Sequence, residues 1–349
     1  MKAGSSALNS RQKAILEIIV QEFVKSGEPV GSLIITENYD IGCCSATVRN
    51  EMARLEEMGY LEQPHAASGR IPKDKAYRLF VNEIISRKIA PPPENAVSTI
   101  EREYQIIQSH LEILIKKTAR LLAELTNYTS LLLAPQLRKS LFKYLRLVSL
   151  SPTRILLFMM NNTGSIIHRT IELSSPISPE VLERLTNLLN DRLQGRALDH
   201  VSEFLKEIPG LETDRELIRN IGDASQHLVE EQQREVFYGG KTRLFDFSEF
   251  RDLDKIKVLM EVMEEEKVVA EILTETLNAD GVQVLIGEEN PVDEMKECSM
   301  VTAAYNLNGE PVGTLGIIGP KRMPYEQIIS IINYTAENFS HKLRHLDRL

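Results

Sequence analysis

The feature that most constrains the fold of this chain is the order of short elements in residues 1–90. A first predicted helix starts near Asn9 and stops at Gly27, and its apolar residues recur at helical spacing: Ile15, Ile18, Ile19 and Phe23. A second short helix, SLIITENY, follows, and a third begins at the cap residue Ser45 and closes at Gly59. The strand signals YLEQP and RIP then flank the polar loop HAASG. Three helices followed by a hairpin predict a winged helix-turn-helix.

The third predicted helix carries two different faces. At about 100° per residue, one stripe is apolar and consists of Val48, Met52 and Leu55. The opposite face is small and polar, and it consists of Ala46, Thr47, Arg49, Asn50, Ala53 and Arg54. Small residues allow a helix to approach the DNA major groove closely, where Asn can pair with adenine and Arg with guanine. For this helix taken alone, an ordinary solvated face is the alternative interpretation.

The predicted hairpin is the most basic part of these 90 residues. Between residues 65 and 78 the only acidic residue is Asp74, whereas the basic residues are Arg70, Lys73, Lys75 and Arg78. The tip of the hairpin can lie along a phosphate backbone, so we expect Arg70 to contact a phosphate or the minor groove. His65 could instead be a turn residue that makes a backbone hydrogen bond. The whole arrangement predicts DNA binding.

The charge of the chain is unevenly distributed. The net charge is −9, yet residues 1–90 hold 12 Lys and Arg against 11 Asp and Glu, and the remainder holds 29 against 39. An acidic body with a near-neutral N-terminal region argues against a protein that binds polyanions over its whole surface. It still allows a local basic patch, which is what sequence-specific DNA binding requires.

Length and residue usage limit the remaining classes of protein. A chain of 349 residues is expected to form two or three domains. No apolar run approaches the roughly 20 residues that span a bilayer. The N-terminal stretch MKAGSSALNS lacks the apolar segment of a secretory signal. We therefore expect no membrane contact and a cytoplasmic location.

The three cysteines are Cys43, Cys44 and Cys298, and they cannot build a disulfide framework. The adjacent pair also lacks the spacing of metal ligands. We interpret these cysteines as small buried or half-buried residues, with a redox role for Cys43 and Cys44 as the alternative.

The rest of the chain has the pattern of a mixed α/β body. The proline-rich stretch IAPPPE is the best linker candidate, and an apolar heptad stripe runs from Val97 to Tyr128. The strand signals YLRLVSL, RILLFMM and SIIHRTIEL, the last two joined by the turn NNTG, precede a largely helical block. Three further strand signals, GVQVLIG, SMVTAAYNL and VGTLGIIGP, come after it, with a turn at Asn308–Gly309 and a final helix from about Pro324. Strands on both sides of a helical block suggest one α/β domain interrupted by an insertion.

Longer motifs in this order give a family resemblance. The stretches GEPVGS, SATVRNEMARLEEMGYLEQPH, SGRIPKDKAYR, GVQVLIGEEN and CSMVTAAYNLNGEPVGTLGIIGPKRMPYEQII closely resemble the HrcA family of bacterial heat-shock repressors. The resemblance implies an α/β multidomain fold with a winged helix at 1–90, a GAF-like domain formed by 94–177 and 276–349, and an inserted, mainly helical dimerisation domain at 178–275. It also implies a homodimer that binds a double-stranded inverted-repeat operator of chaperone operons, releases it on heat stress, and is favoured by the GroE chaperonin.

The resemblance also indicates which residues bind DNA. Carried over by position, the residues that face bases or phosphates are Thr47, Arg49, Asn50 and Arg54, and those on the wing are Arg70 and Lys73. With the neighbouring cap and hairpin residues included, the predicted DNA-binding set is Ser45, Thr47, Arg49, Asn50, Arg54, His65, Ser68, Arg70, Lys73 and Lys75. Cys44 departs from the family pattern, in which a small hydroxyl residue is expected at that position.

Two other functions are alternatives to that of a repressor that binds only its operator. A metabolite-responsive repressor would need an effector pocket, which could lie between the sheet and the helix at residues 324–346. An enzyme would need a nucleophile, a base and an orienting group, and no such set is visible in the sequence. Histidines are scattered without a pair at metal-ligand spacing, so we expect no metal, no cofactor and no catalysis.

Overall fold

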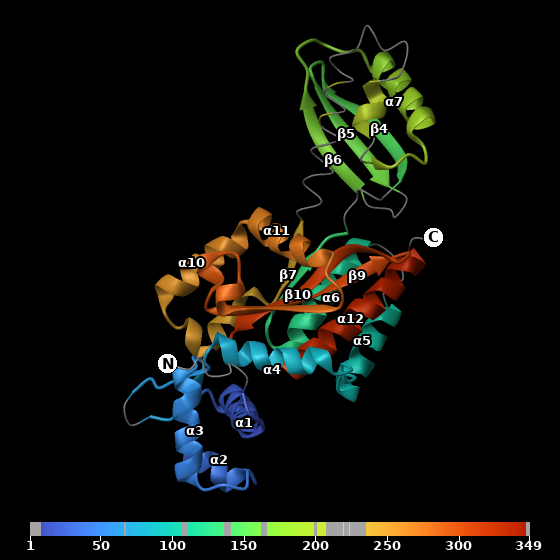
Figure 1. Ribbon diagram of the computed structural model, residues 1–349. Helices are drawn as coiled ribbons and strands as arrows, with labels where there is room; N and C mark the ends of the chain where they lie inside the picture. Colours follow the sequence, from blue (N-terminus) through green and yellow to red (C-terminus); the bar gives the residue numbers. More distant parts are fainter. Residues whose placement is uncertain are drawn as a thin grey trace.

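The computed structural model describes residues 8–65, 68–106, 111–135, 141–161, 166–198, 201–206, 219, 223 and 235–346. The described strands form a two-stranded hairpin, a five-stranded sheet and a three-stranded sheet. Figure 1 shows the N-terminal helices at one end of the molecule, the five-stranded sheet in the middle and the three-stranded sheet at the far end. No described helix is both long enough and apolar enough to cross a membrane.

The N-terminal part, residues 8–73, is called the head. Its elements are α1 (Ser10–Ser26), α2 (Ser32–Asn38), α3 (Ser45–Glu57), β1 (Leu61–Glu62) and β2 (Ile71–Pro72). The predicted helices and strands are therefore present in the predicted order. Asn9 caps α1 by accepting from the Gln12 N–H, and Gly27 ends α1 with a φ of 71° in the left-handed region. Apolar side chains of all three helices form one core: Ile15, Ile19, Ile35, Val48, Met52 and Leu55.

Three helices connect the head to the central sheet. They are α4 (Asp74–Ser86), α5 (Glu94–Ile106) and α6 (Leu111–Thr126). The predicted heptad stripe from Val97 to Tyr128 is divided between α5 and α6, and Ile107 within it lies outside the described residues. The Tyr104 hydroxyl lies 3.0 Å from Thr118 Oγ1. In one straight helix two residues 14 positions apart would be about 21 Å apart, so the two helices fold back on each other and Thr118 is buried against Tyr104.

The central sheet has the strand order β7-β3-β10-β9-β8, and all neighbouring strands are antiparallel. Its strands are β3 (Thr129–Leu133), β7 (Val236–Gly239), β8 (Val282–Ile286), β9 (Cys298–Leu307) and β10 (Glu310–Pro320). The predicted turn between β9 and β10 is present, since Asn308 and Gly309 both have positive φ.

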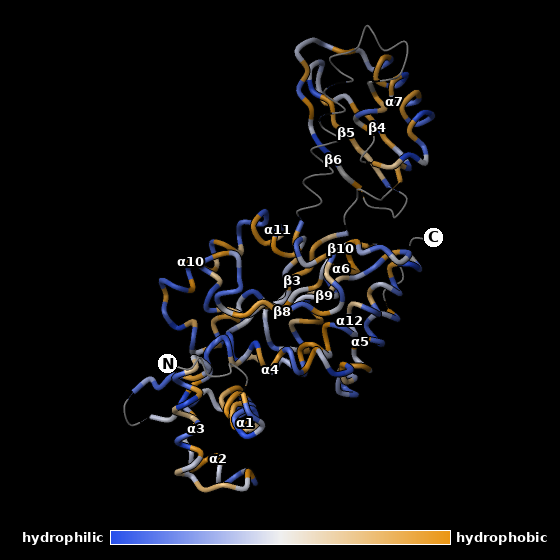
Figure 2. Tube along the Cα trace, in the orientation of Figure 1, coloured by the Kyte–Doolittle hydropathy of each residue, from blue (hydrophilic) through white to orange (hydrophobic). Residues whose placement is uncertain are grey.

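Helices cover both faces of the central sheet. Figure 1 shows α11 (Glu266–Leu277) and α12 (Tyr325–Leu346) on opposite sides, with α10 (Leu253–Glu264) beside α11. Short 3₁₀ helices complete this domain: η4 (Lys241–Asp246), η5 (Ser248–Phe250), η6 (Gly287–Glu289) and η7 (Asp293–Met295). Alternate residues of one strand enter different cores, since Leu132 packs in the α12 core and Leu131 in the α11 core. Figure 2 shows apolar residues along the central strands and on α1, with hydrophilic residues on the outer loops.

The second sheet belongs to a separate unit, which we call the inserted unit (residues 141–206). It contains β4 (Phe142–Ser151), β5 (Arg154–Asn161), β6 (Ile166–Glu172), α7 (Pro179–Leu193) and α8 (Val201–Lys206). Ser178 caps α7, whose leucines pack against the sheet: Leu182, Leu185, Leu189 and Leu193. Figure 1 shows this unit standing away from the central sheet.

The chain leaves and re-enters the central domain at one point. Leu133 at the end of β3 pairs with Val236 at the start of β7, and the Ala134 N–H donates to the Glu235 carbonyl at 2.9 Å. Because these two strands are neighbours in one sheet, the chain between them is an insertion into the central domain.

This arrangement corrects the predicted domain limits of 94–177 and 178–275. The strands β4–β6 do not join the central sheet, and β7, α10 and α11 belong to the central domain rather than to the insertion. The described part of the inserted unit is a sheet with helices rather than mainly helical. Residues 162–164 of the predicted NNTG turn, and residues 207–234 of the predicted helical stretch apart from Arg219 and Asp223, lie outside the described residues. The error arose because alternation of apolar residues marks a strand without indicating which sheet the strand joins.

Candidate nucleic-acid interface

The outer face of α3 is an open part of the predicted DNA-binding set. Arg49 and Asn50 are exposed, whereas Val48 and Met52 on the opposite side are fully buried. Neither Arg49 nor Asn50 makes a side-chain hydrogen bond or ion pair with any residue the structure describes. Both side chains are therefore available to the edges of DNA bases, which Arg and Asn recognise by paired hydrogen bonds.

The start of α3 is tied to the rest of the head by hydroxyl groups. Ser45 Oγ lies 2.9 Å from Ser32 Oγ, so this pair joins α3 to α2. Thr47 Oγ1 lies 3.4 Å from the sulfur of Cys44, which occupies the cap position of α3. This hydrogen bond from Thr47 and the backbone N–H groups of the first turn lower the pKa of the exposed Cys44 thiol.

Arg54 already has a carboxylate partner. Its Nη1 lies 3.1 Å from Glu51 Oε1, while the arginine side chain remains 63% exposed. Glu51 is buried and also accepts a hydrogen bond of 2.9 Å from Gln12 on α1. Arg54 can therefore reach a phosphate at the edge of α3, but part of its charge is balanced within the head.

The tip of the hairpin is closed by Ser68. The His65 N–H donates to Ser68 Oγ at 3.0 Å, and the Ser68 hydroxyl donates to the His65 carbonyl at 2.7 Å. His65 thus makes the backbone hydrogen bonds of a turn residue, and its ring is exposed. The role of Ser68 in the structure is to shape the turn that presents His65.

Arg70 does not reach outward as the sequence prediction required. Its Nε donates to Glu56 Oε2 of α3 at 2.9 Å, and its side chain is only 13% exposed. Its backbone pairs with Val30, which adds a third segment to the hairpin. Gly69 permits this pairing, because a Cβ atom there would overlap the backbone of Val30. Arg70 therefore fixes the hairpin on α3.

The two lysines of the predicted DNA-binding set, Lys73 and Lys75, also differ in how strongly they are bound by other groups of the protein. Lys75 donates to the Met58 carbonyl at 3.0 Å and lies over the Tyr60 ring, so it stabilises the carboxyl end of α3. Lys73 is 51% exposed and forms a long ion pair of 4.0 Å with the equally exposed Glu62. Of the two lysines, Lys73 is therefore the one that can turn to a phosphate.

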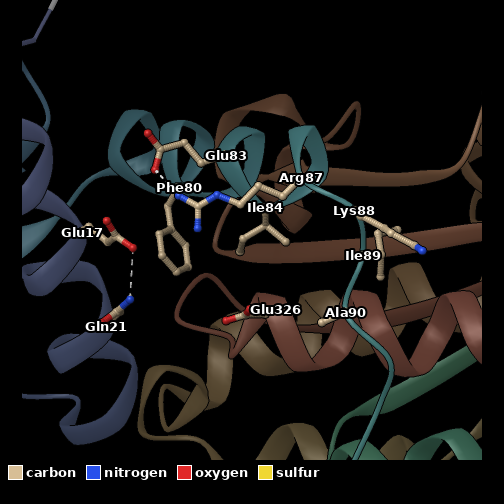
Figure 3. A pocket seen from close by; sticks show the side chains of 10 residues that line it. All are labelled: Glu17, Gln21, Phe80, Glu83, Ile84, Arg87, Lys88, Ile89, Ala90 and Glu326. Atoms are coloured by element: carbon tan, nitrogen blue, oxygen red, sulfur yellow. Dashed lines mark hydrogen bonds and ion pairs between the residues drawn. The ribbon is translucent and has the colours of Figure 1, made fainter.

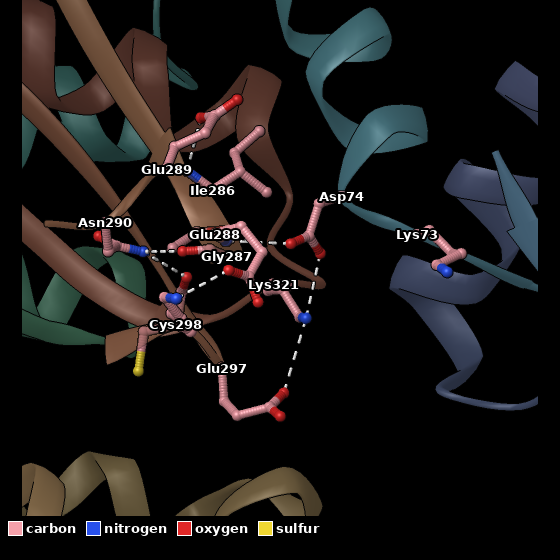
Figure 4. A network of polar contacts seen from close by, with 12 residues as sticks. Lys73, Asp74, Ile286, Gly287, Glu288, Glu289, Asn290, Glu297, Cys298 and Lys321 are labelled. Carbon is pink, nitrogen blue, oxygen red and sulfur yellow. Dashed lines mark hydrogen bonds and ion pairs between the residues drawn. The ribbon is translucent and has the colours of Figure 1, made fainter. Parts of the chain in front are cut away.

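The sequence prediction missed the residues that join the head to the central domain. On α4, Asp74 contacts Lys321 of the central domain (Figure 4). Arg78, on the same helix, contacts Glu289 of the central domain. A signal was present in the sequence, since the two charges are four residues apart and so share one face of a helix. That spacing could not indicate partners more than 200 residues away.

The predicted effector site between the sheet and the helix at 324–346 is packed with side chains. Ile328, Ile332 and Phe339 of α12 are fully buried against the sheet. A hollow is present elsewhere, between α1, α4 and α12, where the lining includes Glu17 and Glu326 (Figure 3). Among the described residues, no group of three or more His, Cys, Asp or Glu side chains is placed to hold a metal ion.

Known proteins match this chain over nearly its whole length. The family model described as HrcA protein C terminal domain matches residues 112–329. The heat-inducible transcription repressor HrcA of Natranaerobius thermophilus is 38% identical over 344 residues, which cover 97% of each chain. The protein of the same name from Pelotomaculum thermopropionicum is 35% identical, and 98% of each chain is covered. A crystal structure described only as that of a hypothetical protein has the same fold, with a TM-score of 0.65 at 24% identity, covering 97% of this chain and 100% of that one.

Proposed function

Because the chain belongs to the HrcA family of heat-inducible transcription repressors, we propose that it binds an inverted-repeat operator as a homodimer and releases it on heat stress. Family membership makes the protein a negative regulator of heat-shock genes that binds DNA, and not an enzyme. The operator, the dimer, the response to heat and the residues that read DNA are the parts we propose. A repressor must reach the chromosome, so we place the protein in the cytoplasm.

The head acts as a winged helix-turn-helix in this proposal. The helix α3 enters the major groove, and Arg49 and Asn50 read bases because they are exposed and lack partners among the described residues. Thr47 at the start of α3 and Arg54 at its edge contact the phosphate backbone of the DNA. Lys73 and His65 contact phosphates along the hairpin, while Ser45, Ser68, Arg70 and Lys75 hold the two elements in place. A helix in the groove flanked by phosphate contacts is how such heads combine specificity with affinity.

The inserted unit supports the homodimer. One face of its sheet is covered by α7, but the other exposes large apolar side chains: Tyr144, Leu150 and Ile166 at the surface, with Leu156, Phe158 and Met160 half-buried between them. Leu150 is 52% and Ile166 is 60% exposed. An apolar sheet face of this kind is stable when a second layer covers it. We propose that the same face of a second copy supplies that layer, which pairs the two heads.

The central domain is the GAF-like part of the family fold, and its role here is to connect the dimer to the heads. The GroE chaperonin is the proposed partner that favours the active form. A chaperonin acts on chains that expose apolar surface, and the open face of the inserted unit is such a surface before the dimer forms.

The observation that carries this proposal is the unpaired Arg49 and Asn50 on α3 of a chain in the HrcA family. The test is footprinting of the purified protein on the promoters of the chaperone genes of its own genome. We expect protection of an inverted repeat, and loss of that protection in the Arg49→Ala variant. Protection of DNA without any repeat, or identical footprints for both proteins, would count against the proposal.

A further inference from the structure

The helix α4 joins the head to the central domain without a flexible linker. Only Lys73 separates the hairpin strand β2 from Asp74, the first residue of α4. The helix packs on α1 in the head and on β8 and α12 in the central domain. The buried rings of Tyr77 and Tyr325 lie 6.1 Å apart across this contact. The direction of α4 therefore sets the direction of the head.

Asp74 makes the first charged contact at this junction. Its Oδ1 lies 3.0 Å from Lys321 Nζ, and its Oδ2 accepts the Glu288 N–H at 3.1 Å (Figure 4). Lys321 is held in turn by Glu297 at 3.6 Å. Gly287 has a φ of 53°, and a Cβ atom there would overlap Asp74 Oδ2. The loop before β9 is thus shaped to receive this one carboxylate.

Arg78 makes the second charged contact, one turn further along α4. It forms a two-pronged pair with Glu289, whose first bond, Nε to Oε1, is 2.7 Å long, and it also donates to the Val284 carbonyl. Glu289 is fixed because it accepts the Ile286 N–H at 2.9 Å. A bidentate pair between a guanidinium and an immobilised carboxylate restricts rotation as well as distance.

The two contacts have opposite polarity, which specifies the register of α4 on the central domain. The helix α4 supplies the acid at Asp74 and the base at Arg78, and the central domain supplies the complementary Lys321 and Glu289. A slip of α4 by one turn would bring Asp74 toward Glu289 or Arg78 toward Lys321. Like charges at such a separation repel each other, so only one register satisfies both pairs.

Elsewhere the head meets the central domain less closely. The hollow between α1, α4 and α12 separates Glu17 and Gln21 of the head from Glu326 (Figure 3). Arg322, paired with Glu249, lies beneath the end of α1, with its Cζ 3.3 Å from where a Cβ of Gly27 would be. With a hollow beside it, the orientation of the head depends strongly on the charged pairs of α4.

We propose that Asp74 and Arg78 are positioning residues that orient the head so that the two α3 helices of a dimer meet both halves of the operator together. This inference rests on the proposed function, because it needs two heads and a two-part site. Two heads held in the right geometry bind as one unit, and the second contact is then made at a high effective concentration. Heads that can turn lose that advantage, although each still recognises its own half-site.

The experiment compares two DNA duplexes and uses the full-length protein. One duplex carries the inverted repeat footprinted with the wild type, and the other carries one intact half-site with the second half scrambled. Dissociation constants are measured by fluorescence anisotropy for the wild type and for Arg78→Ala and Lys321→Ala, which break the junction from either side. Arg87→Ala is the matched control, because Arg87 directly follows α4 and, among the described residues, its side chain pairs only with Glu83 of that helix.

We expect Arg78→Ala and Lys321→Ala to weaken binding to the inverted repeat by at least about tenfold and to leave half-site binding within about twofold. Arg87→Ala should leave both constants unchanged, and Arg78→Lys should recover part of the lost affinity because it keeps the charge. Light scattering and circular dichroism spectra are measured for each variant, and we expect them to match those of the wild-type dimer.

Unchanged binding of Arg78→Ala to the inverted repeat would overturn the inference. An equal loss on both duplexes would also overturn it, because it would mean that Arg78 supports the head itself or contacts DNA. A wild-type protein that binds the two duplexes equally would overturn the proposed function, and this inference with it.

Discussion

Arg49 and Arg70 carry the same charge in opposite surroundings. Arg49 is exposed on α3 without a partner among the described residues, whereas Arg70 is largely buried and bonded to Glu56. An arginine that already holds a carboxylate must give up that pair before it can bind a phosphate, and leaving the carboxylate unpaired adds a further cost. Replacement of Arg49 and replacement of Arg70 should therefore have different effects on the protein.

Replacement of Arg49 should reduce specificity. We expect Arg49→Ala to cost about 1–3 kcal/mol of binding to the operator and much less on scrambled DNA, because a lost base contact matters only at the correct base. Titration of both DNAs at one salt concentration measures the difference, with Arg87→Ala as a control for the lost charge. An equal loss on the two DNAs would show that Arg49 contacts a phosphate and not a base.

Replacement of Lys73 and of Arg70 should separate phosphate binding from stability. We expect Lys73→Ala to weaken all DNA sequences alike and to lower the slope of log K against log salt by about 1, with an unchanged melting temperature. Arg70→Ala should instead lower the unfolding free energy by about 1–2 kcal/mol, because Glu56 loses its charged partner. Salt titrations and urea denaturation measure the two effects. A salt slope that is the same for Lys73→Ala and the wild type would rule out the phosphate contact.

The cysteines should differ in reactivity. Cys44 is exposed and its pKa is lowered, chiefly by the Thr47 hydroxyl, whereas burial raises the pKa of Cys298 to about 12. Since the thiolate is the reactive form, iodoacetamide at neutral pH should modify Cys44 in the folded protein and spare Cys298. Mass spectrometry of the peptides measures both rates. Thr47→Val should raise the Cys44 pKa and slow its alkylation, and an unchanged rate would contradict the assigned cause.

At the scale of elements, local signals were sufficient in the head and insufficient in the body. The caps, glycine stops and apolar stripes of α1 and α3 lie within one helix each, so the sequence alone could predict which apolar residues of α3 are buried, although it did not indicate the burial of Glu51. The pairing of Arg70 with Glu56 could not be read in this way, because it depends on how the hairpin folds back on α3. The heptad stripe after Val97 was likewise insufficient, since a stripe of one period runs through both α5 and α6 and does not indicate that they are two helices packed on each other.

The open face of the β4–β6 sheet gives a prediction for the element as a whole. Phe158 lies in the middle strand of this face, with Arg146 and His168 as its cross-strand neighbours. We expect Phe158→Glu to dissociate the dimer, because the carboxylate would have to lose its water in the proposed interface, a cost that a buried pair with Arg146 does not repay. Light scattering measures the mass. Leu253→Glu is the control, since Leu253 is an apolar residue of α10 that is 78% exposed and does not lie on this face. A dimer of Phe158→Glu as tight as the wild type would place the interface elsewhere.

At the scale of the whole molecule, the sequence indicated an insertion but not its position. The insertion becomes evident only when β3 and β7, more than 100 residues apart, are seen to pair. The candidate site was likewise predicted only in part. Its exposed residues on α3 could be predicted from the sequence, but the charged residues that we propose orient the head could not. Asp74 and Arg78 depend on Lys321 and Glu289, and a contact between such distant segments leaves no periodic signal in either one.

The proposed response to heat follows from the proposed dimer, because operator affinity would then need two folded heads, two junctions and one dimer contact at once. We expect brief heating to abolish binding to the inverted repeat while the head, which has its own core, still binds a half-site after cooling. Loss of the dimer removes the second contact and with it most of the affinity. Refolding with the GroE chaperonin and ATP should restore binding, and chaperonin without ATP is the control. Operator binding should therefore be lost at a lower temperature than the one at which the head unfolds, because loss of the dimer contact or of a junction is sufficient. Operator binding that survives heating undiminished would contradict this prediction.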